Sequence, residues 1–295
     1  STTGGNSWSP VVFAKDDLAD FANYAISCIT QTPGGDIYAG TGEGWFYQHG
    51  TNHATPMIMG GGIYKSSDRG ESWTRLSATW DVNDDDVLHD FAYVNEIAAD
   101  PITGYVYAAT AGGLKVTTDG GTTWNPVAYE EIGYENRVAQ DITFASDGSA
   151  VASVGNACFI KRAGEDTSFK LRSGSVSDGL ISSSGVGRLE FAFSPTDPNY
   201  VYCIAAKTDQ TLQNIYQSTD KGNTWVVIGF GGSADFQPLG TQGIYDIAIY
   251  VSPEDPYYIL VAGLNVWQGR GIPGATLFAW EQVTQWSLSP LNPIY

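Results

Sequence analysis

The turn SSDRGESW at Ser66–Trp73 recurs as TTDGGTTW at Thr117–Trp124 and as STDKGNTW at Ser218–Trp225. The shared pattern is [ST]-x-Asp-x-Gly-x-x-Trp, and each fixed residue suits a β-hairpin. The Asp carboxylate accepts N–H bonds within its own turn, the Gly adopts a positive φ, and the Trp anchors the next strand. The residues expected to build these turns are Asp68, Gly70, Trp73, Asp119, Gly121, Trp124, Asp220, Gly222 and Trp225. Three copies in one chain indicate an internal repeat.

Degenerate copies of the turn extend this repeat along the chain. Trp73 and Trp124 lie 51 residues apart, whereas Trp124 and Trp225 lie 101 apart, with the decayed copy RAGEDTSF ending between them at Phe169. Two more decayed copies, STTGGNSW and PGATLFAW, occur near the ends of the chain. The repeats therefore end near Trp8, Trp73, Trp124, Phe169, Trp225 and Trp280.

Each repeat contains short apolar runs separated by Gly, Pro, Asp and Asn turns. Runs such as IYAGT, VYAAT, AVASV, VYCIA and ILVAG have the small, β-branched and aromatic residues typical of buried strands. A strand-rich repeat of about 50 residues predicts a β-propeller with one four-stranded blade per repeat. We therefore expect an all-β chain in which residues 1–295 form a single propeller, with about five complete repeats and a partial one.

On these turns and strands, the chain resembles the Asp-box (BNR-repeat) β-propellers along nearly its whole length. This group includes sialidases, xyloglucanase-type glycoside hydrolases and sortilin-like receptors, and the chain looks most similar to large secreted bacterial Asp-box repeat proteins. The resemblance implies a secreted or cell-surface location. It also implies that the Asp box is a structural turn rather than an active site.

Composition excludes some partners. The formal net charge is −18 with only 14 Lys and Arg, which argues against nucleic acid and favours a cation or a neutral sugar over an anionic ligand. No segment approaches 18 consecutive apolar residues, so membrane insertion is not expected. Cys28, Cys158 and Cys203 show no zinc spacing and are expected to be buried free thiols, with a disulfide as the alternative.

Both ends of the repeat pattern look incomplete. The three strands that should precede the Trp8 turn are missing, and SLSPLNPIY at the other end supplies one strand at most. An open propeller exposes a blade face and an unpaired edge. We therefore expect a larger propeller of seven or eight blades, completed by further blades or domains or covered by a partner. A five-bladed ring with Val11–Ala14 as an extra strand is the alternative.

An acidic residue recurs beside the first apolar residue of the innermost strands. These acids are Glu96, Asp141, Glu190 and Asp246, and Ser27 is the expected equivalent in the first repeat. Because inner strands run along the central channel, the acids are expected to face it. Converging carboxylates could bind a cation, raise one another's pKa or act as an acid/base pair. The alternative is a hydrated channel lining with structural hydrogen bonds. If the protein is an enzyme, Asp141 and Asp246 are the predicted catalytic pair, with Glu96 and Glu190 in ligand binding.

The longest interruption of the repeat is GEGWFYQHGTNHATPMIMGGG at Gly42–Gly62. Aromatic faces stack on sugar rings, and loops on a rigid scaffold carry function. The predicted ligand-binding residues here are Trp45, Phe46, Tyr47, His49 and His53. Alternatively, this loop folds its aromatic side chains over a neighbouring blade.

A second acidic loop, DVNDDDVLHD at Asp81–Asp90, is the leading candidate for a metal. Hard cations prefer oxygen ligands, so Ca²⁺ is the expected ion, although the Gly and the distant Glu of an EF-hand are missing. The predicted ligands are Asp81, Asp84, Asp85 and Asp86, and the alternative is a solvated acidic loop. No cofactor is expected to be required.

Catalytic patterns are incomplete in this sequence. RGIP at Arg270–Pro273 differs from the Arg-Ile-Pro motif of sialidases and comes late, and only three histidines are available for a nucleophilic triad. The leading prediction is therefore a non-catalytic binding or scaffold propeller for a glycan or protein partner. An Asp-box-type glycoside hydrolase that uses carboxylates at the channel mouth is the alternative.

Overall fold

The computed structural model describes residues 5–7, 12–13, 25–42, 44, 59–80 and 89–286. Strands dominate these residues, which include two short 3-10 helices at Ser77–Thr79 and Val176–Asp178. The strands form five blade sheets and a small two-stranded sheet. The predicted all-β propeller of four-stranded blades is therefore confirmed.

The first two blades follow the predicted order from the inner to the outer strand. Blade 1 contains β2 (Ile26–Gln31), β3 (Ile37–Thr41), β4 (Ile63–Ser66) and β5 (Ser72–Arg75). A short strand β1 (Val12–Phe13) pairs in parallel with β5, so this segment is an extra outer strand of blade 1. Blade 2 contains β6 (Val94–Ala99), β7 (Val106–Thr110), β8 (Gly113–Thr117) and β9 (Asn125–Pro126).

The other three blades repeat this meander. Blade 3 contains β10 (Ala139–Phe144), β11 (Ala150–Val154), β12 (Ala157–Lys161) and β13 (Lys170–Leu171). Blade 4 contains β16 (Val186–Phe193), β17 (Val201–Lys207), β18 (Leu212–Ser218) and β19 (Val226–Phe230). Blade 5 contains β20 (Ala248–Val251), β21 (Tyr258–Ala262), β22 (Val266–Gly271) and β23 (Phe278–Gln282). Between blades 3 and 4, β14 (Ser173–Gly174) pairs with β15 (Ile181–Ser182).

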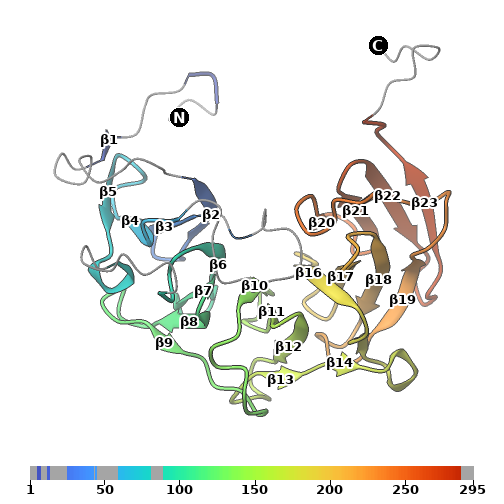
Figure 1. Cartoon of the computed structure of the whole chain (residues 1–295), viewed down its shortest axis with the longest axis horizontal. Helices are drawn as coiled ribbons and strands as arrows, with labels where there is room; N and C mark the ends of the chain where they lie inside the picture. Colours follow the sequence, from blue (N-terminus) through green and yellow to red (C-terminus); the bar gives the residue numbers. More distant parts are fainter. Residues whose placement is uncertain are drawn as a thin grey trace.

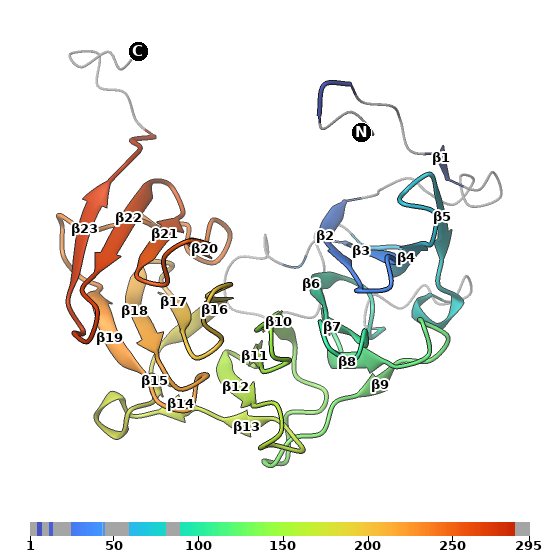
Figure 2. The ribbon, with the colours of Figure 1, turned by 180° about the vertical axis from the view of Figure 1, so that it is seen from behind.

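The five blades are arranged as an open arc, with blades 1 and 5 on either side of the gap (Figure 1). The view from behind shows the same arrangement, with the inner strands β6, β10 and β16 toward the middle (Figure 2). Each inner strand packs beside the inner strand of the next blade, from β2 through to β20. Ring closure over five blades is thus not observed, and the alternative of a five-bladed ring is wrong for the described residues.

Blade-to-blade packing forms the core. Separate apolar clusters fill the interfaces between blades 1 and 2, 2 and 3, 3 and 4, and 4 and 5. Middle strands such as β7 and β17 are buried almost throughout because a neighbouring blade covers each of their faces. The close packing of blades 1 and 2 requires a residue without a side chain at position 40. A Cβ on Gly40 would lie 2.5 Å from Cys28 Sγ. The three cysteines are buried free thiols, as predicted.

The three repeated turns contain the predicted hydrogen bonds. In the blade 4 copy, Asp220 Oδ1 accepts from the Thr224 N–H at 2.7 Å and from Ser218 Oγ at 2.8 Å. The Gly222 N–H donates to Ser218 Oγ at 2.8 Å, and Gly222 has a φ of 86°. The same bonds recur around Asp68 and Asp119. These bonds lower the pKa of Asp68 and Asp119 to about 2.

The decayed turn of blade 3 uses a different set of contacts. Asp166 accepts from Arg162 N and Nε, each at 2.9 Å, and also pairs with Lys170 Nζ at 3.1 Å. The predicted anchor Phe169 is buried in the interface between blades 2 and 3. An ion-pair network therefore holds the turn where the sequence pattern is lost. The predicted anchor Trp8 lies outside the described residues.

Candidate functional site

The inner strands share a β-bulge that the sequence pattern did not reveal. In blades 1 to 4 the pairing between the first two strands shifts at one residue, namely Ser27, Asn95, Gln140 and Gly187. A bulge leaves one residue unpaired and redirects its side chain. Ser27, Asn95 and Gln140 occupy the same position in their strands, whereas the bulge at Gly187 lies two residues earlier in the longer strand β16.

The side chains at the bulges connect each blade to the next. Ser27 Oγ donates to the Val94 carbonyl at 2.5 Å, and Asn95 Nδ2 donates to the Ala139 carbonyl at 2.8 Å. Gln140 Nε2 donates to the Gly187 carbonyl at 3.2 Å. Because Gly187 has no side chain, the adjacent Arg188 makes the last connection, donating from Nη1 to the Ile244 carbonyl at 2.7 Å.

The strand registers confirm part of the predicted ring of equivalent acids and correct the rest. Glu96 and Asp141 both follow their bulge directly, but Arg188 occupies that position in blade 4 and Cys28 occupies it in blade 1. Glu190 lies two residues further along β16. Counted back from the last paired residue of the inner strand, however, Glu96, Asp141 and Glu190 occupy the same position, so their predicted equivalence is confirmed. Cys28 and Ala248 hold this position in blades 1 and 5, so the predicted equivalences of Ser27 and Asp246 are wrong. A residue count from the turn cannot detect a bulge, because each bulge inserts one unpaired residue.

Three of the predicted acids nevertheless lie close enough to interact. Glu96, Asp141 and Glu190, together with Arg188, form a buried group that we call the inner-strand cluster. Arg188 Nε donates to Glu190 Oε1 at 2.7 Å, and Arg188 Nη2 approaches the same oxygen at 2.5 Å. Asp246 precedes β20 and is not among the charges that shift the pKa values of the three acids.

Burial is the main electrostatic influence on these acids. It raises the pKa of Glu96 from 4.5 to about 7, and the charge of Glu190 adds to this shift. Burial likewise raises the pKa of Asp141 well above its usual range, again with repulsion from Glu190. In Glu190, burial raises the pKa while Arg188 opposes the shift. The inner-strand cluster thus contains one cation, Arg188, and three carboxyl groups. Protonation of at least one of these acids near neutral pH relieves the repulsion between them.

The contacts of Asp141 identify its role as structural. Its side chain is buried, and its Oδ2 accepts from the Phe191 N–H of blade 4 at 2.7 Å. It therefore connects blades 3 and 4 through a structural hydrogen bond, as the alternative expected, but it is buried rather than exposed in a hydrated channel. Glu96 is more accessible, and its Oε1 accepts from the Ile97 N–H at 3.0 Å. Among the described side chains, no three His, Cys, Asp or Glu are grouped in a way that could hold a metal ion.

The two other predicted sites cannot be placed. Trp45, Phe46, Tyr47, His49 and His53 lie outside the described residues, as do Asp81, Asp84, Asp85 and Asp86. The aromatic binding loop and the Ca²⁺ loop remain predictions.

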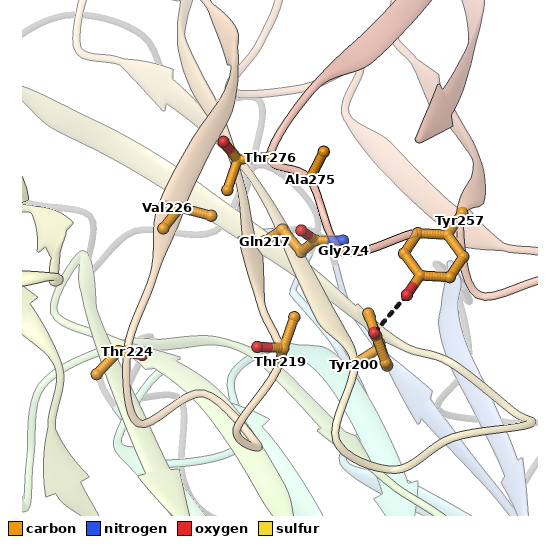
Figure 3. A pocket seen from close by; sticks show the side chains of 9 residues that line it. All are labelled: Tyr200, Gln217, Thr219, Thr224, Val226, Tyr257, Gly274, Ala275 and Thr276. Carbon is orange, nitrogen blue, oxygen red and sulfur yellow. Dashed lines mark hydrogen bonds between the residues drawn. The ribbon is translucent and has the colours of Figure 1, made fainter. Parts of the chain in front are cut away.

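A groove at the outer rim between blades 4 and 5 is a site that the sequence analysis missed. It has a volume of about 270 Å³ and is lined by Tyr200, Gln217, Thr219, Thr224, Val226, Tyr257, Gly274, Ala275 and Thr276. Figure 3 shows the hydroxyl groups of Tyr200 and Tyr257 pointing toward each other, and their oxygens lie 2.6 Å apart. This bond raises the pKa of Tyr200 to about 12. The lining has no charged side chain and combines aromatic rings with hydroxyl and amide groups.

This groove has a counterpart between blades 2 and 3. There Tyr107 and Val116 face the decayed turn of blade 3, with Lys161, Thr167 and Ser168 in the lining. Each groove is lined by residues of two neighbouring blades. The groove between blades 4 and 5 is distinguished by its tyrosine pair and its uncharged lining, and we call it the tyrosine groove.

Comparisons with known proteins support the architecture. No family model matches the sequence, and a search of curated proteins gave no match. Among solved structures, the GH74 xyloglucanase from Xanthomonas campestris aligns with a TM-score of 0.56 and 15% identity, over 86% of this chain and 46% of that one. An ancestral GH74 enzyme aligns with a TM-score of 0.58 and 16% identity, over 88% of this chain and 35% of that one.

A putative 6-phosphogluconolactonase from Bacteroides uniformis aligns with a TM-score of 0.51 and 13% identity, over 88% of this chain and 85% of that one. The chain thus spans less than half the length of the two GH74 enzymes. At these identities the likeness shows the fold alone. In the part of the chain that the structure describes, no helix has the length and apolar character needed to cross a membrane. The sequence repeats and the similar solved structures both indicate a β-propeller fold.

Proposed function

We propose that this chain is a non-catalytic binding propeller that acts outside the cell and recognises a neutral glycan. The observation that carries the proposal is the uncharged tyrosine groove, whose rings and hydroxyl groups suit the faces and hydroxyls of a sugar. Asp141 and Arg188 of the inner-strand cluster bind backbone groups of neighbouring blades, which favours a structural role for these two residues.

Kinship with the Asp-box propellers is part of this proposal. The three turns around Asp68, Asp119 and Asp220 share one pattern of hydrogen bonds. One of the similar solved structures is named as a GH74 xyloglucanase, an enzyme that acts on a glycan. The net charge of −18 fits a neutral ligand better than an anionic one. A protein partner, and Ca²⁺ at the Asp81–Asp86 loop, remain the other binding predictions.

A glycan array with the purified chain tests the proposal. Binding of neutral oligosaccharides should be lost in Tyr257→Ala and weakened in Tyr257→Phe, which keeps the ring but removes the hydroxyl bond to Tyr200. Tyr105→Ala is the matched control, because Tyr105 is an exposed tyrosine that lines neither groove. Equal binding by the wild type and Tyr257→Ala would reject this groove as the site.

A glycoside hydrolase is the second candidate, favoured by one observation. A pKa of about 7 would let Glu96 hold a proton for a leaving group at neutral pH. In this second proposal the proton donor is Glu96 rather than the predicted Asp141 or Asp246, because Asp141 is buried and bonded to blade 4. Turnover of a neutral β-linked polysaccharide that Glu96→Gln abolishes, with folding intact, would favour this reading.

A further inference from the structure

The tyrosine groove has one deeply buried polar side chain, Gln217 of β18. Gln217 is 3% exposed, whereas the three threonines of the lining are exposed residues. Figure 3 shows the Gln217 amide among the other lining residues, between Val226 and Tyr257. A buried amide needs partners for both its donor and its acceptor, so the bonds of Gln217 indicate what the groove binds.

The donor side of Gln217 is already used within the protein. Its Nε2 donates to the Tyr202 hydroxyl at 2.8 Å, and this hydroxyl donates to the Pro256 carbonyl at 2.5 Å. Because a carbonyl oxygen only accepts, the Tyr202 proton points toward Pro256 and the Tyr202 oxygen accepts from Gln217. Burial raises the pKa of Tyr202, which keeps this proton in place. The two bonds therefore fix the orientation of the Gln217 amide and leave Oε1 as its free acceptor.

The acceptor side of Gln217 has no partner in the part of the chain that the structure describes. A ligand that fills the groove excludes solvent from Oε1, so the ligand itself has to donate a hydrogen bond to this oxygen. A ring that presents only ether oxygens and methyl groups cannot do so. The groove therefore favours a ligand with a hydroxyl or N–H group directed at Gln217.

The tyrosine pair supplies the complementary group. The Tyr200 and Tyr257 hydroxyls lie 2.6 Å apart, and one of them donates to the other. Two hydroxyl groups carry two protons, so one proton of the pair is left to be donated to a ligand. The lining thus offers both an acceptor and a donor, and a sugar hydroxyl can satisfy either of them.

The size of the groove limits what it encloses. Its volume of about 270 Å³ is smaller than the roughly 300–1,000 Å³ of pockets that hold drug-sized ligands. We propose that the tyrosine groove binds a single sugar ring, and that Gln217 Oε1 accepts an obligatory hydrogen bond from one hydroxyl group of that ring. This inference rests on the proposed function and specifies which part of the glycan is recognised and by which atom.

Binding of single sugars, measured by saturation-transfer NMR and calorimetry, tests the proposal. The probes are the methyl glycosides of glucose, galactose, mannose and xylose. We expect at least one of them to bind the wild type, and Gln217→Met to weaken this binding at least about tenfold, because methionine keeps the side-chain length without the amide oxygen. Gln213→Met is the matched control and should leave the affinity unchanged, since Gln213 is another buried glutamine of β18 that lines neither groove.

Ligand analogues give the same test without a protein variant. Among the monodeoxy derivatives of the methyl glycoside that binds, one should bind the wild type at least about tenfold more weakly than its parent, because it leaves Gln217 Oε1 without a donor. The same derivative should lose no further affinity in Gln217→Met, which has already lost the acceptor. This series also decides the question if Gln217→Met does not fold.

Two outcomes overturn the inference and leave the proposed function standing. Longer glycans that bind and lose binding in Tyr257→Ala, without binding of any methyl glycoside, would show that the groove recognises more than one ring. Equal affinity of the wild type and Gln217→Met for one glycoside, with no sensitive deoxy position, would show that Oε1 is not the acceptor. If no glycan binds, or if Tyr257→Ala binds glycans as the wild type does, the proposed function fails and the inference fails with it.

Discussion

Asp141 and Phe191 join two blades through a single hydrogen bond, in which Asp141 Oδ2 accepts from the Phe191 N–H at 2.7 Å. The two residues lie 50 positions apart on the inner strands of blades 3 and 4. A buried N–H that loses its acceptor is costly, so the carboxyl is held there by the backbone of the next blade. Substitutions that keep or remove this acceptor can therefore separate an effect of Asp141 on stability from an effect on catalysis.

Asp141→Leu should lower the free energy of unfolding by about 1–3 kcal/mol, because it leaves the Phe191 N–H without its acceptor. Asp141→Asn keeps an acceptor oxygen and should cost less. Urea titration followed by tryptophan fluorescence measures both. Asp246→Asn serves as the control, because Asp246 is only partly buried. An unchanged midpoint for Asp141→Leu would contradict the structural role.

Glu96 should make stability depend on pH between about 4.5 and 7. The folded chain holds the Glu96 proton up to about pH 7, whereas the unfolded chain releases it near pH 4.5. The folded state therefore binds more protons in this window, and its stability falls as the pH rises through it. The raised pKa values of Asp141 and Glu190 act in the same direction.

Glu96→Gln should remove the contribution of Glu96 to this pH dependence and leave that of Asp141 and Glu190. At pH 8 the variant should be more stable than the wild type by up to about 3 kcal/mol, and at pH 4 the two should agree. Melting temperatures measured from pH 4 to 8 give the comparison. Parallel curves for the two proteins would show that Glu96 titrates normally.

Asp220→Ala should cost about 1 kcal/mol of stability, as the loss of other capping side chains does. The substitution removes the acceptor for the Thr224 N–H and hydroxyl, both 2.7 Å from Asp220. Asp235→Ala, at an exposed loop position, is the control and should change stability little. Because its bonds lower the pKa of Asp220, this contribution should also disappear as the pH falls below about 4. Thermal unfolding at pH 7 and pH 3 checks both expectations.

Truncation of two equivalent isoleucines should change the free energy of unfolding by very different amounts. Ile97 is 2% exposed because blade 1 covers it, whereas Ile29 on the inner strand of blade 1 is 61% exposed. Ile97→Ala should therefore cost about 2–5 kcal/mol, and Ile29→Ala should change stability by less than about 0.5 kcal/mol. A large loss for Ile29→Ala in the isolated chain would mean that another element covers blade 1 at this point.

The sequence by itself determined the blade and its turn. Each repeated turn encodes its own bonds through the Ser or Thr, the Asp and the Gly, all within eight residues. Such local interactions can be read from a pattern because the same residues make them wherever the repeat occurs. The spacing of the anchors then predicted four-stranded blades, and Phe169 was identified even where its turn had decayed.

The tertiary structure decided which residues meet between blades. The bulges at Ser27, Asn95, Gln140 and Gly187 shift the register by one residue, so Arg188 rather than an acid follows the bulge in blade 4. The tyrosine groove likewise brings together Tyr200 and Tyr257 from neighbouring blades. Contacts of this kind depend on strand register and on the packing of distant segments, neither of which a repeat pattern specifies. The sequence therefore determined the unit of the fold, and packing between units determined its candidate sites.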